Sequence, residues 1–263
     1  MNTLLQMRKV GLTYHTLKNE TVAIKDLSLE SYEGELLGIV GPSGCGKTTI
    51  LSLLSGILTP SQGEVLLNGE RANCQSGLTG YMLQKDELLP WRSIMSNVLL
   101  GLEIKKRKTP DKEKYAEELL KKYNLYDFKD FYPNQLSGGM KQRVALIRTL
   151  VLEPKLLLLD EPFSALDFQT RLNVVEDVYG ILKSEGKSAV FVTHDISEAI
   201  SMCDRVAVLS QRPSTVKEMI DLTPLGHCTP LERREHPRFG EYFDRIWSNL
   251  QTTKEKSDET QTT

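Results

Sequence analysis

The stretch Gly41 to Thr48, GPSGCGKT, decides how the rest of this sequence is interpreted. It matches the pattern G-x-x-x-x-G-K-[ST], follows the apolar run 35–40 and precedes a helical pattern over 48–58. Glycines let successive backbone N–H groups converge on phosphate oxygens, and the helix that follows contributes its positive N-terminal end. The sequence therefore predicts a phosphate-binding loop between a strand and a helix.

Two side chains of this loop indicate what it binds. Lys47 supplies a mobile cation for the β- and γ-phosphates of a nucleotide, and the Thr48 hydroxyl is placed to ligate Mg²⁺. Cys45 occupies a free position of the pattern, and we interpret it as a filler; a redox-active thiol of low pKa is the alternative. The nucleotide contacts predicted for the loop are Gly41, Pro42, Ser43, Gly44, Cys45, Gly46, Lys47, Thr48 and Thr49.

A second polar group follows an apolar run at residues 155–162, KLLLLDEP. Four consecutive leucines predict a strand buried on both faces, and Asp160 and Glu161 come at its end. In open α/β sheets ligands gather at the carboxyl ends of the strands, so we expect Gly41, Asp160 and His194 to lie together. Asp160 would hold Mg²⁺, and Glu161 would orient or deprotonate an attacking water. A hydrogen-bonded core histidine is the alternative for His194 alone.

The order of the predicted elements indicates an α/β fold. The first 80 residues are strand-rich, residues 93–152 have a helical periodicity, and residues 155–210 alternate short apolar runs with helix-length amphipathic pieces. That alternation is typical of a parallel sheet. The helical residues therefore look like an insertion into an α/β core whose first strand is 36–40.

Composition excludes several classes of protein. With 33 Lys and Arg against 35 Asp and Glu, the net charge is -2, so bulk charge indicates no nucleic-acid partner. No apolar run approaches the roughly 18 to 20 residues of a membrane helix, and the N-terminus lacks the profile of a secretory signal. The 4 cysteines have neither disulfide nor metal spacing. We expect a cytosolic chain with reduced thiols.

Residues Leu136 to Arg143, LSGGMKQR, place Ser137 and two glycines at a helix start, which is a second anion-binding helix end. Together with LLLLDEP, Ser164 to Asp167 and His194, this string resembles the ATP-binding cassette family. The resemblance covers about residues 4 to 210. It implies an α/β P-loop NTPase core with an N-terminal antiparallel β subdomain and an inserted α-helical subdomain.

The resemblance also implies a division of the chain and a role for each motif. It assigns residues 1–210 to the ATPase domain with the helical subdomain at 85–152, 211–250 to a C-terminal extension and 251–263 to a polar, disordered tail. In the family, 136–142 is the signature segment, 164–167 the D-loop and His194 the switch histidine that contacts the γ-phosphate. The implied catalytic residues are Lys47, Gln84, Glu161 and His194; the Mg²⁺ residues are Thr48, Gln84 and Asp160; and the further ATP-binding residues are Tyr14, Ser137, Gly138, Gly139 and Asp167.

Tyr14 resembles the aromatic residue that stacks on adenine, although a strand aromatic could equally belong to the core. The family implies that the signature segment of one copy closes over the P-loop nucleotide of a second copy, giving two composite sites. It further implies two membrane-spanning permease subunits, a solute-binding protein as an indirect partner, and a place on the cytoplasmic face of the cell membrane.

The segment Leu88 to Trp91, LLPW, looks like importer ATPases for nitrate, taurine, sulfonates and related solutes. Arg212-Pro213 and residues 233–250 are similar to the same group. Trp91 is interpreted either as a docking surface for a membrane subunit or as a core tryptophan. Which solute is transported stays open, since a sulfonate, nitrate, taurine, bicarbonate, a vitamin precursor or riboflavin would fit.

Four other classes of ATPase or subunit are alternatives to an importer. Export is the closest alternative and stays open; the LLPW segment and the absence of fused membrane helices favour import. A DNA-repair or chromosome-organising ATPase would carry a long heptad insertion between Gln84 and Leu136, where no sustained heptads occur. A translation-associated protein would carry two cassettes in tandem. A nonenzymatic scaffold subunit would be expected to lose the acid at Glu161, which is present.

Overall fold

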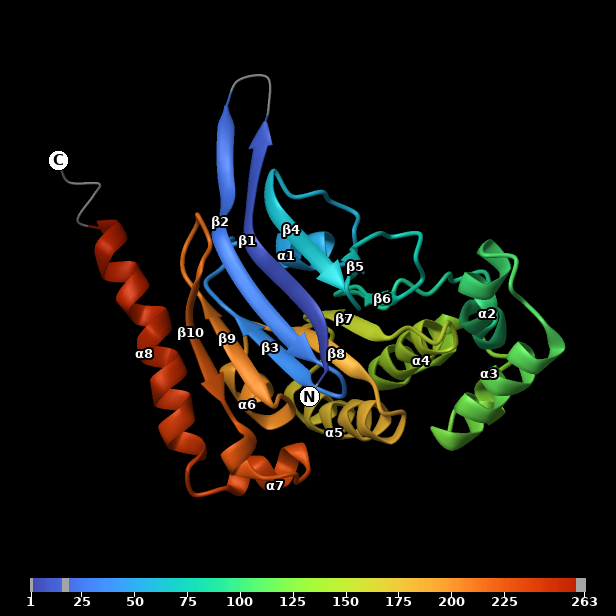
Figure 1. Ribbon diagram of the computed structural model, residues 1–263. Helices are drawn as coiled ribbons and strands as arrows, with labels where there is room; N and C mark the ends of the chain where they lie inside the picture. Colours follow the sequence, from blue (N-terminus) through green and yellow to red (C-terminus); the bar gives the residue numbers. More distant parts are fainter. Residues whose placement is uncertain (1, 16–18, 259–263) are drawn as a thin grey trace.

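The computed structural model describes residues 2–15 and 19–258, which form two sheets with helices around them (Figure 1). One sheet is antiparallel, with the order β2-β1-β4-β5, and the other has the order β10-β9-β3-β8-β7-β6. In the second sheet the strands from β9 to β6 are parallel and β10 is antiparallel to β9. The strands are β1 (Thr3–His15), β2 (Glu20–Tyr32), β3 (Leu36–Val40), β4 (Gln62–Leu67), β5 (Glu70–Arg71), β6 (Thr79–Met82), β7 (Leu156–Asp160), β8 (Ser188–Val192), β9 (Arg205–Leu209) and β10 (Val216–Asp221).

The helices divide into two groups according to the core that they cover. One core lies between the two sheets and includes residues of α1, and the other lies on the opposite face of the parallel sheet, against α4, α5, α6 and α8. α2 and α3 pack on α4 and extend to one side of the molecule (Figure 1). The helices are α1 (Lys47–Leu54), α2 (Ile94–Ile104), α3 (Pro110–Lys122), α4 (Gly138–Leu150), α5 (Phe168–Ser184), α6 (Ile196–Met202), α7 (Pro230–Glu235) and α8 (Phe239–Asp258).

The leucine strand β7 is buried on both faces, as its sequence predicts. Leu156 and Leu158 contribute to the core between the sheets, whereas Leu157 and Leu159 contribute to the core under the helices. Successive side chains of a strand point to opposite faces, so an uninterrupted apolar run supplies both cores at once.

The strand register brings the predicted site residues to one edge of the parallel sheet. Ile39 of β3 pairs with Val192 of β8, and Val192 pairs in turn with Asp160 of β7. On the far side of β7, Met82 of β6 pairs with Leu159. The residues that follow these strands therefore emerge side by side, which places the phosphate loop, the acidic pair, His194 and Gln84 at one edge.

One predicted helix is shorter in the structure, and the predicted helical region consists of separate helices. The helix after the phosphate loop ends at Leu54 instead of residue 58, because Gly56 has a φ of +74° and closes the helix in a left-handed turn. The region of helical periodicity over 93–152 contains α2, α3 and α4, and Asn124, with a φ of +57°, follows the end of α3. Both breaks carry the sequence signal of a C-terminal cap, which the periodicity alone does not reveal.

The residues after 210 include β10, α7 and α8, and this segment packs against the parallel sheet and its helices. β10 pairs with β9, and α8 packs along β9 and α6. The structure continues α8 to Asp258, where the sequence analysis expects a tail from residue 251, and residues 259–263 lie outside the described part of the chain. Within the described residues, no helix combines the length and the apolar character that crossing a membrane requires.

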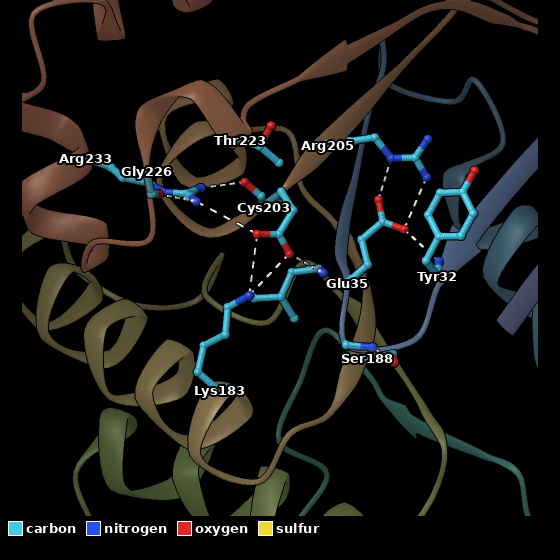
Figure 2. A network of polar contacts seen from close by, with 12 residues as sticks. Tyr32, Glu35, Lys183, Ser188, Cys203, Arg205, Thr223, Gly226 and Arg233 are labelled. Carbon is cyan, nitrogen blue, oxygen red and sulfur yellow. Dashed lines mark hydrogen bonds and ion pairs between the residues drawn. The ribbon is translucent and has the colours of Figure 1, made fainter. Parts of the chain in front are cut away.

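A buried arginine attaches this C-terminal segment to the core. Arg233 of α7 is fully buried, and its guanidinium donates to the carbonyl oxygens of Gly226, Ile200 and Cys203. It also lies 3.9 Å from the carboxylate of Asp204, an ion pair that Figure 2 shows beside Lys183. Burial of an arginine is costly unless its charge and donors find partners, and here they do.

A second ion pair in Figure 2 joins β9 to the start of β3. Arg205 donates to both oxygens of Glu35, with Nε at 2.5 Å and Nη2 at 3.1 Å, and its guanidinium lies over the ring of Tyr32. Glu35 also accepts from the backbone N–H of Tyr32 at 2.7 Å. The turn into β3 is therefore fixed to the neighbouring strand β9, at the end of β3 opposite to the phosphate loop.

Candidate functional site

The phosphate loop has the backbone conformation that its glycines permit. Gly44 and Gly46 have φ values of +72° and +107°, in the left-handed region that residues with a Cβ rarely adopt. Gly46 is also the N-cap residue of α1, so the loop passes directly into the helix start. Unpaired N–H groups at a helix N-terminus and the helix dipole both favour an anion at this position.

Lys47 lies inside the loop that it belongs to. Its side chain is buried, and Nζ donates to the carbonyl oxygens of Gly41 at 2.9 Å and Pro42 at 3.1 Å. The loop borders a depression of about 320 Å³, lined by Ser43, Gly44, Gly46, Lys47, Thr48, Thr49 and Glu161. The predicted phosphate-loop residues and the predicted catalytic acid thus share one concave surface.

Cys45 is buried at the phosphate loop. Burial raises the pKa of its thiol, and the nearby Lys47 charge only partly offsets that effect. A redox-active cysteine needs a lowered pKa and solvent access. Burial and the raised pKa of the thiol therefore favour the interpretation of Cys45 as a packing residue.

Asp160 lies at the end of β7, next to the first turn of α1. Its carboxylate accepts a hydrogen bond from the Tyr81 hydroxyl at 3.2 Å. Burial raises the pKa of Asp160, and hydrogen bonds from Tyr81 and Thr48 act in the opposite direction. The Thr48 hydroxyl and the Asp160 carboxylate are therefore neighbours, and both offer oxygen atoms to a hard divalent cation.

Glu161 is the centre of a polar cluster drawn from three strand ends. Its Oε2 atom lies 3.0 Å from Nδ1 of His194 and accepts from Nε2 of Gln84 at 3.3 Å. Gln84 also donates to the Ser164 hydroxyl at 3.1 Å, and Ser164 donates to the carbonyl of Glu161 at 3.0 Å. His194 is half exposed rather than enclosed in the core, which removes the alternative of a core histidine.

The backbone of Glu161 is in an uncommon conformation. Its φ is +45°, and its N–H donates to the carbonyl of Val192 at 2.9 Å. A left-handed conformation in a residue with a Cβ costs on the order of 1–3 kcal/mol and persists only where the surroundings enforce it. Here the neighbouring strand β8 holds the backbone while the side chain is directed to Gln84 and His194.

The signature segment begins α4 and is separate from the depression. Ser137 is the N-cap residue, and its side chain accepts from the Met140 N–H at 3.3 Å, with Gly138 and Gly139 in the first turn. None of these residues lines the depression at the phosphate loop. Asp167 is the N-cap of α5, and hydrogen bonds from Thr170 hold its pKa below the usual range.

Two aromatic residues that had alternative interpretations are exposed. Tyr14, near the end of β1, is 40% exposed, and its hydroxyl lies 3.2 Å from the Thr49 hydroxyl of α1. Trp91 is 72% exposed. The interpretation of either residue as part of the core is therefore wrong. Tyr14 offers a ring face beside the phosphate loop, and Trp91 lies on the surface after Gln84.

Comparison with known proteins identifies the family. The ABC transporter family model matches residues 24–164. The chain belongs to the ABC transporter family. It is similar to an uncharacterized ABC transporter ATP-binding protein of Bacillus subtilis, YtlC, at 44% identity over 96% of this chain and 97% of that protein. The chain is thus an ATPase of the ABC type, as its motifs predict.

Two other relatives are named for the solute that is imported, taurine in one case and nitrate in the other. The taurine import ATP-binding protein TauB of Roseobacter denitrificans is 39% identical, with 86% of this chain and 87% of that protein covered. The nitrate import ATP-binding protein NrtD of Synechocystis is 36% identical, with 94% of each chain covered. These relatives confirm that the sequence resembles the nitrate and taurine group of import ATP-binding proteins.

A solved structure confirms the fold class. A dimeric ATP-binding cassette in a post-hydrolysis state, bound to ADP and phosphate, superposes with a TM-score of 0.71 at 31% identity, covering 83% of this chain and 99% of that chain. The α/β P-loop core, the antiparallel β subdomain and the inserted helices are therefore those of the ABC ATPase.

The sequence did not identify several residues that complete the cluster. Tyr81 binds Asp160, and Arg148 of α4 donates to the carbonyl oxygens of Asp86 and Glu87 just after Gln84. The family resemblance assigns Ser164 to the D-loop but does not predict its hydrogen bonds to Gln84 and Glu161. Tyr81 could have been noticed as a polar side chain at the end of a buried strand next to β7; Arg148 carries no such signal because its partners are backbone atoms.

Proposed function

We propose that this chain is the ATPase subunit of an importer and that two copies bind and hydrolyse Mg-ATP at their interface. The observation that carries the proposal is the meeting of Lys47, Asp160, Glu161, Gln84 and His194 at one edge of the parallel sheet. These residues supply the charge, the metal ligands and the base that phosphoryl transfer to water requires.

The residues near the phosphate loop fit a magnesium ion. The Thr48 hydroxyl, the Asp160 carboxylate and the Gln84 amide oxygen are hard oxygen donors, and Mg²⁺ prefers one or two carboxylates together with substrate phosphates. Within the described part of the chain no group of three His, Cys, Asp or Glu residues could form a closed metal cage, which agrees with such an open site. When bound, Mg²⁺ would neutralise charge on the phosphates.

Glu161 is proposed to activate the attacking water. Its carboxylate borders the depression and accepts hydrogen bonds, so a water on its free oxygen would be oriented toward the γ-phosphate. His194 and Gln84 hold that carboxylate from two sides. Tyr14 would stack on the adenine ring, and the N–H groups of the loop and of α1 would bind the phosphates.

The signature segment of a second copy is proposed to complete the site. Ser137 and the glycines that follow it form a helix N-terminus suited to an anion, yet none of them lines the depression of their own chain. The dimeric state of the similar cassette bound to ADP and phosphate supports this arrangement. Asp167, at the start of α5, would lie near the same interface.

Import of a small solute is proposed from the relatives with similar sequence. The taurine and nitrate import ATP-binding proteins match along most of this chain, and the segment Leu88 to Trp91 is present here. We infer two membrane-spanning permease subunits as direct partners, a solute-binding protein as an indirect partner, and a place on the cytoplasmic face of the membrane. The exposed Trp91 would contact the permease.

Replacing Lys47 by Ala should weaken nucleotide binding. The ammonium would donate charge-assisted hydrogen bonds to the phosphates, and loss of such bonds costs about 1.5–3 kcal/mol, or roughly 10- to 150-fold in affinity. Titration of the full chain with a fluorescent ATP analogue measures the change. Arg8→Ala serves as the control, since Arg8 pairs with Glu64 on the antiparallel sheet. An unchanged affinity in the Lys47→Ala variant would contradict the phosphate site.

The proposal that this chain drives import is tested with the assembled transporter. The chain is purified with the membrane proteins that accompany it, reconstituted in vesicles, and assayed for ATP hydrolysis and uptake with nitrate, taurine and an aliphatic sulfonate, each with the cognate solute-binding protein. We expect one solute to increase ATP turnover and to accumulate in the direction of import. Release of solute driven by ATP would identify an exporter instead.

A further inference from the structure

Arg171 of α5 touches the two catalytic loops that flank it, and no motif of the sequence singles it out. We propose that Arg171 is a positioning residue that joins the D-loop to the His194 loop, so that the two move as one unit. The His194 loop is defined here as residues 193–195 together with the first turn of α6, 196–198. This inference rests on the proposed function, because it assigns Arg171 to the hydrolytic site described above.

On one side, Arg171 holds the D-loop. Its Nη2 atom donates to the carbonyl oxygen of Leu166 at 2.9 Å, and Leu166 directly precedes Asp167. Asp167 in turn caps the helix that carries Arg171, by accepting from the Thr170 N–H at 3.0 Å. The end of the D-loop is thus bound both by the start of α5 and by the arginine one turn further along.

On the other side, Arg171 faces two carboxylates of the His194 loop. Nη1 lies 3.7 Å from Oδ2 of Asp195, and Nε lies 3.8 Å from Oε1 of Glu198. Glu198 is buried, and its other oxygen accepts from the Thr193 hydroxyl at 2.7 Å. Thr193 and Asp195 flank His194 on either side, so the arginine contacts the support of the histidine rather than the histidine itself.

These contacts form a closed chain through the catalytic acid. His194 lies 3.0 Å from Glu161, and Glu161 is held by Ser164, which belongs to the D-loop. Arg171 closes the chain from the other direction, between Leu166 and the carboxylates of the His194 loop. A shift of the D-loop, where a second copy is proposed to dock, would therefore be transmitted to His194 through a charged side chain that is only 24% exposed.

The Nε of Arg171 is buried without a hydrogen-bond partner. Its ion pairs with Asp195 and Glu198 are longer than hydrogen bonds, so the guanidinium has unused donor capacity toward the His194 loop. Burial raises the pKa of Glu198, and the Thr193 hydrogen bond and the Arg171 charge act in the opposite direction. The short hydrogen bond of Arg171 is the one to Leu166 in the D-loop, and its longer ion pairs are those to Asp195 and Glu198.

The test compares Arg171→Ala and Arg171→Lys in the full chain, with kcat, ATP affinity and thermal stability as readouts. Misplacement of catalytic groups by about 1 Å can cost up to 100-fold, so we expect Arg171→Ala to lower kcat at least about ten-fold. ATP affinity should stay within about two-fold, because Arg171 does not reach the phosphate loop. Arg171→Lys keeps the charge without the planar fork and should recover part of kcat.

Lys183→Ala is the matched control. Lys183 lies on the same helix, is 32% exposed, and pairs with the partly buried Asp204 at 3.2 Å, far along α5 from both catalytic loops. We expect this variant to lose a similar amount of thermal stability while kcat stays near the parent value. If Arg171→Ala and Lys183→Ala behave alike in both readouts, Arg171 is merely structural and the inference is wrong.

A double-mutant comparison separates action through His194 from any other effect. If Arg171 works by positioning His194, adding Arg171→Ala to the His194→Ala variant should lower the remaining kcat by less than about two-fold. An undiminished loss in that background would overturn the proposed route. Failure of the parent chain to hydrolyse ATP would instead count against the proposed function itself. Failure of the inference about Arg171 and failure of the proposed function can therefore be told apart.

Discussion

Replacing Glu161 by Gln should leave ATP binding intact and reduce ATP turnover by at least about 100-fold, the scale typical of losing a general base. Glutamine keeps the size and the hydrogen-bonding shape of the side chain but has no basic oxygen. The amide can still contact Gln84 and His194, so the cluster around position 161 should keep its geometry. Turnover measured by phosphate release, with binding measured by titration, checks both halves of the expectation.

The contrast with Lys47→Ala makes the Glu161 result specific. Lys47 lies in the phosphate loop and should act on affinity, whereas Glu161 should act on the chemical step. A kcat within a few-fold of the parent would remove Glu161 from the role of base. ATP hydrolysis would then need another group to act as the base. Asp160 is not free for that role, because its carboxylate is hydrogen-bonded by Tyr81 and Thr48.

Replacing Arg233 by Ala should destabilise the chain strongly, although the residue is remote from the phosphate loop. Its removal leaves the carbonyl oxygens of Gly226, Ile200 and Cys203 without their donor and takes one cation from Asp204. Asp204 keeps Lys183 as a cation, so the loss comes mainly from the carbonyl oxygens, and each buried acceptor left unsatisfied costs about 1–3 kcal/mol. Urea denaturation followed by circular dichroism measures the free energy of unfolding.

Arg238→Ala is the control for this stability measurement. Arg238 is close to Arg233 in sequence, but its partner Glu241 is exposed and the pair lies on the surface of α8. Exposed ion pairs of this kind contribute little, so we expect no measurable change. Equal stability of the Arg233→Ala variant and the parent would show that the segment after residue 210 is not attached through this arginine.

The site was largely predictable because its chemistry is local in the sequence. The spacing of glycines before Lys47 and the two acids after the leucine run each carry a physical reason, and the order of parallel strands brings their ends together. Gln84 and Tyr14 required the resemblance to a family, since a single glutamine after a strand or a single tyrosine within one has no distinctive pattern.

What the sequence could not predict depends on contacts between distant segments. Arg171 looks like any charged residue on an amphipathic helix, and only the fold shows it between Leu166 and Glu198. Arg233 likewise resembles a surface arginine, yet it is fully buried. The end of α1 at Leu54 was missed for a different reason, because the periodicity continues past Gly56, which adopts a left-handed conformation.

The central claim is that ATP is held between the phosphate loop of one copy and the signature helix of another. Sedimentation of the Glu161→Gln variant with Mg-ATP tests it most directly, because this variant should bind ATP without consuming it. We expect the sedimenting mass to double when ATP is added, and to stay that of a monomer when Ser137→Arg is also present, although ATP still binds. A mass that is unchanged by bound ATP in Glu161→Gln, or a dimer that forms equally well with Ser137→Arg, would contradict the account.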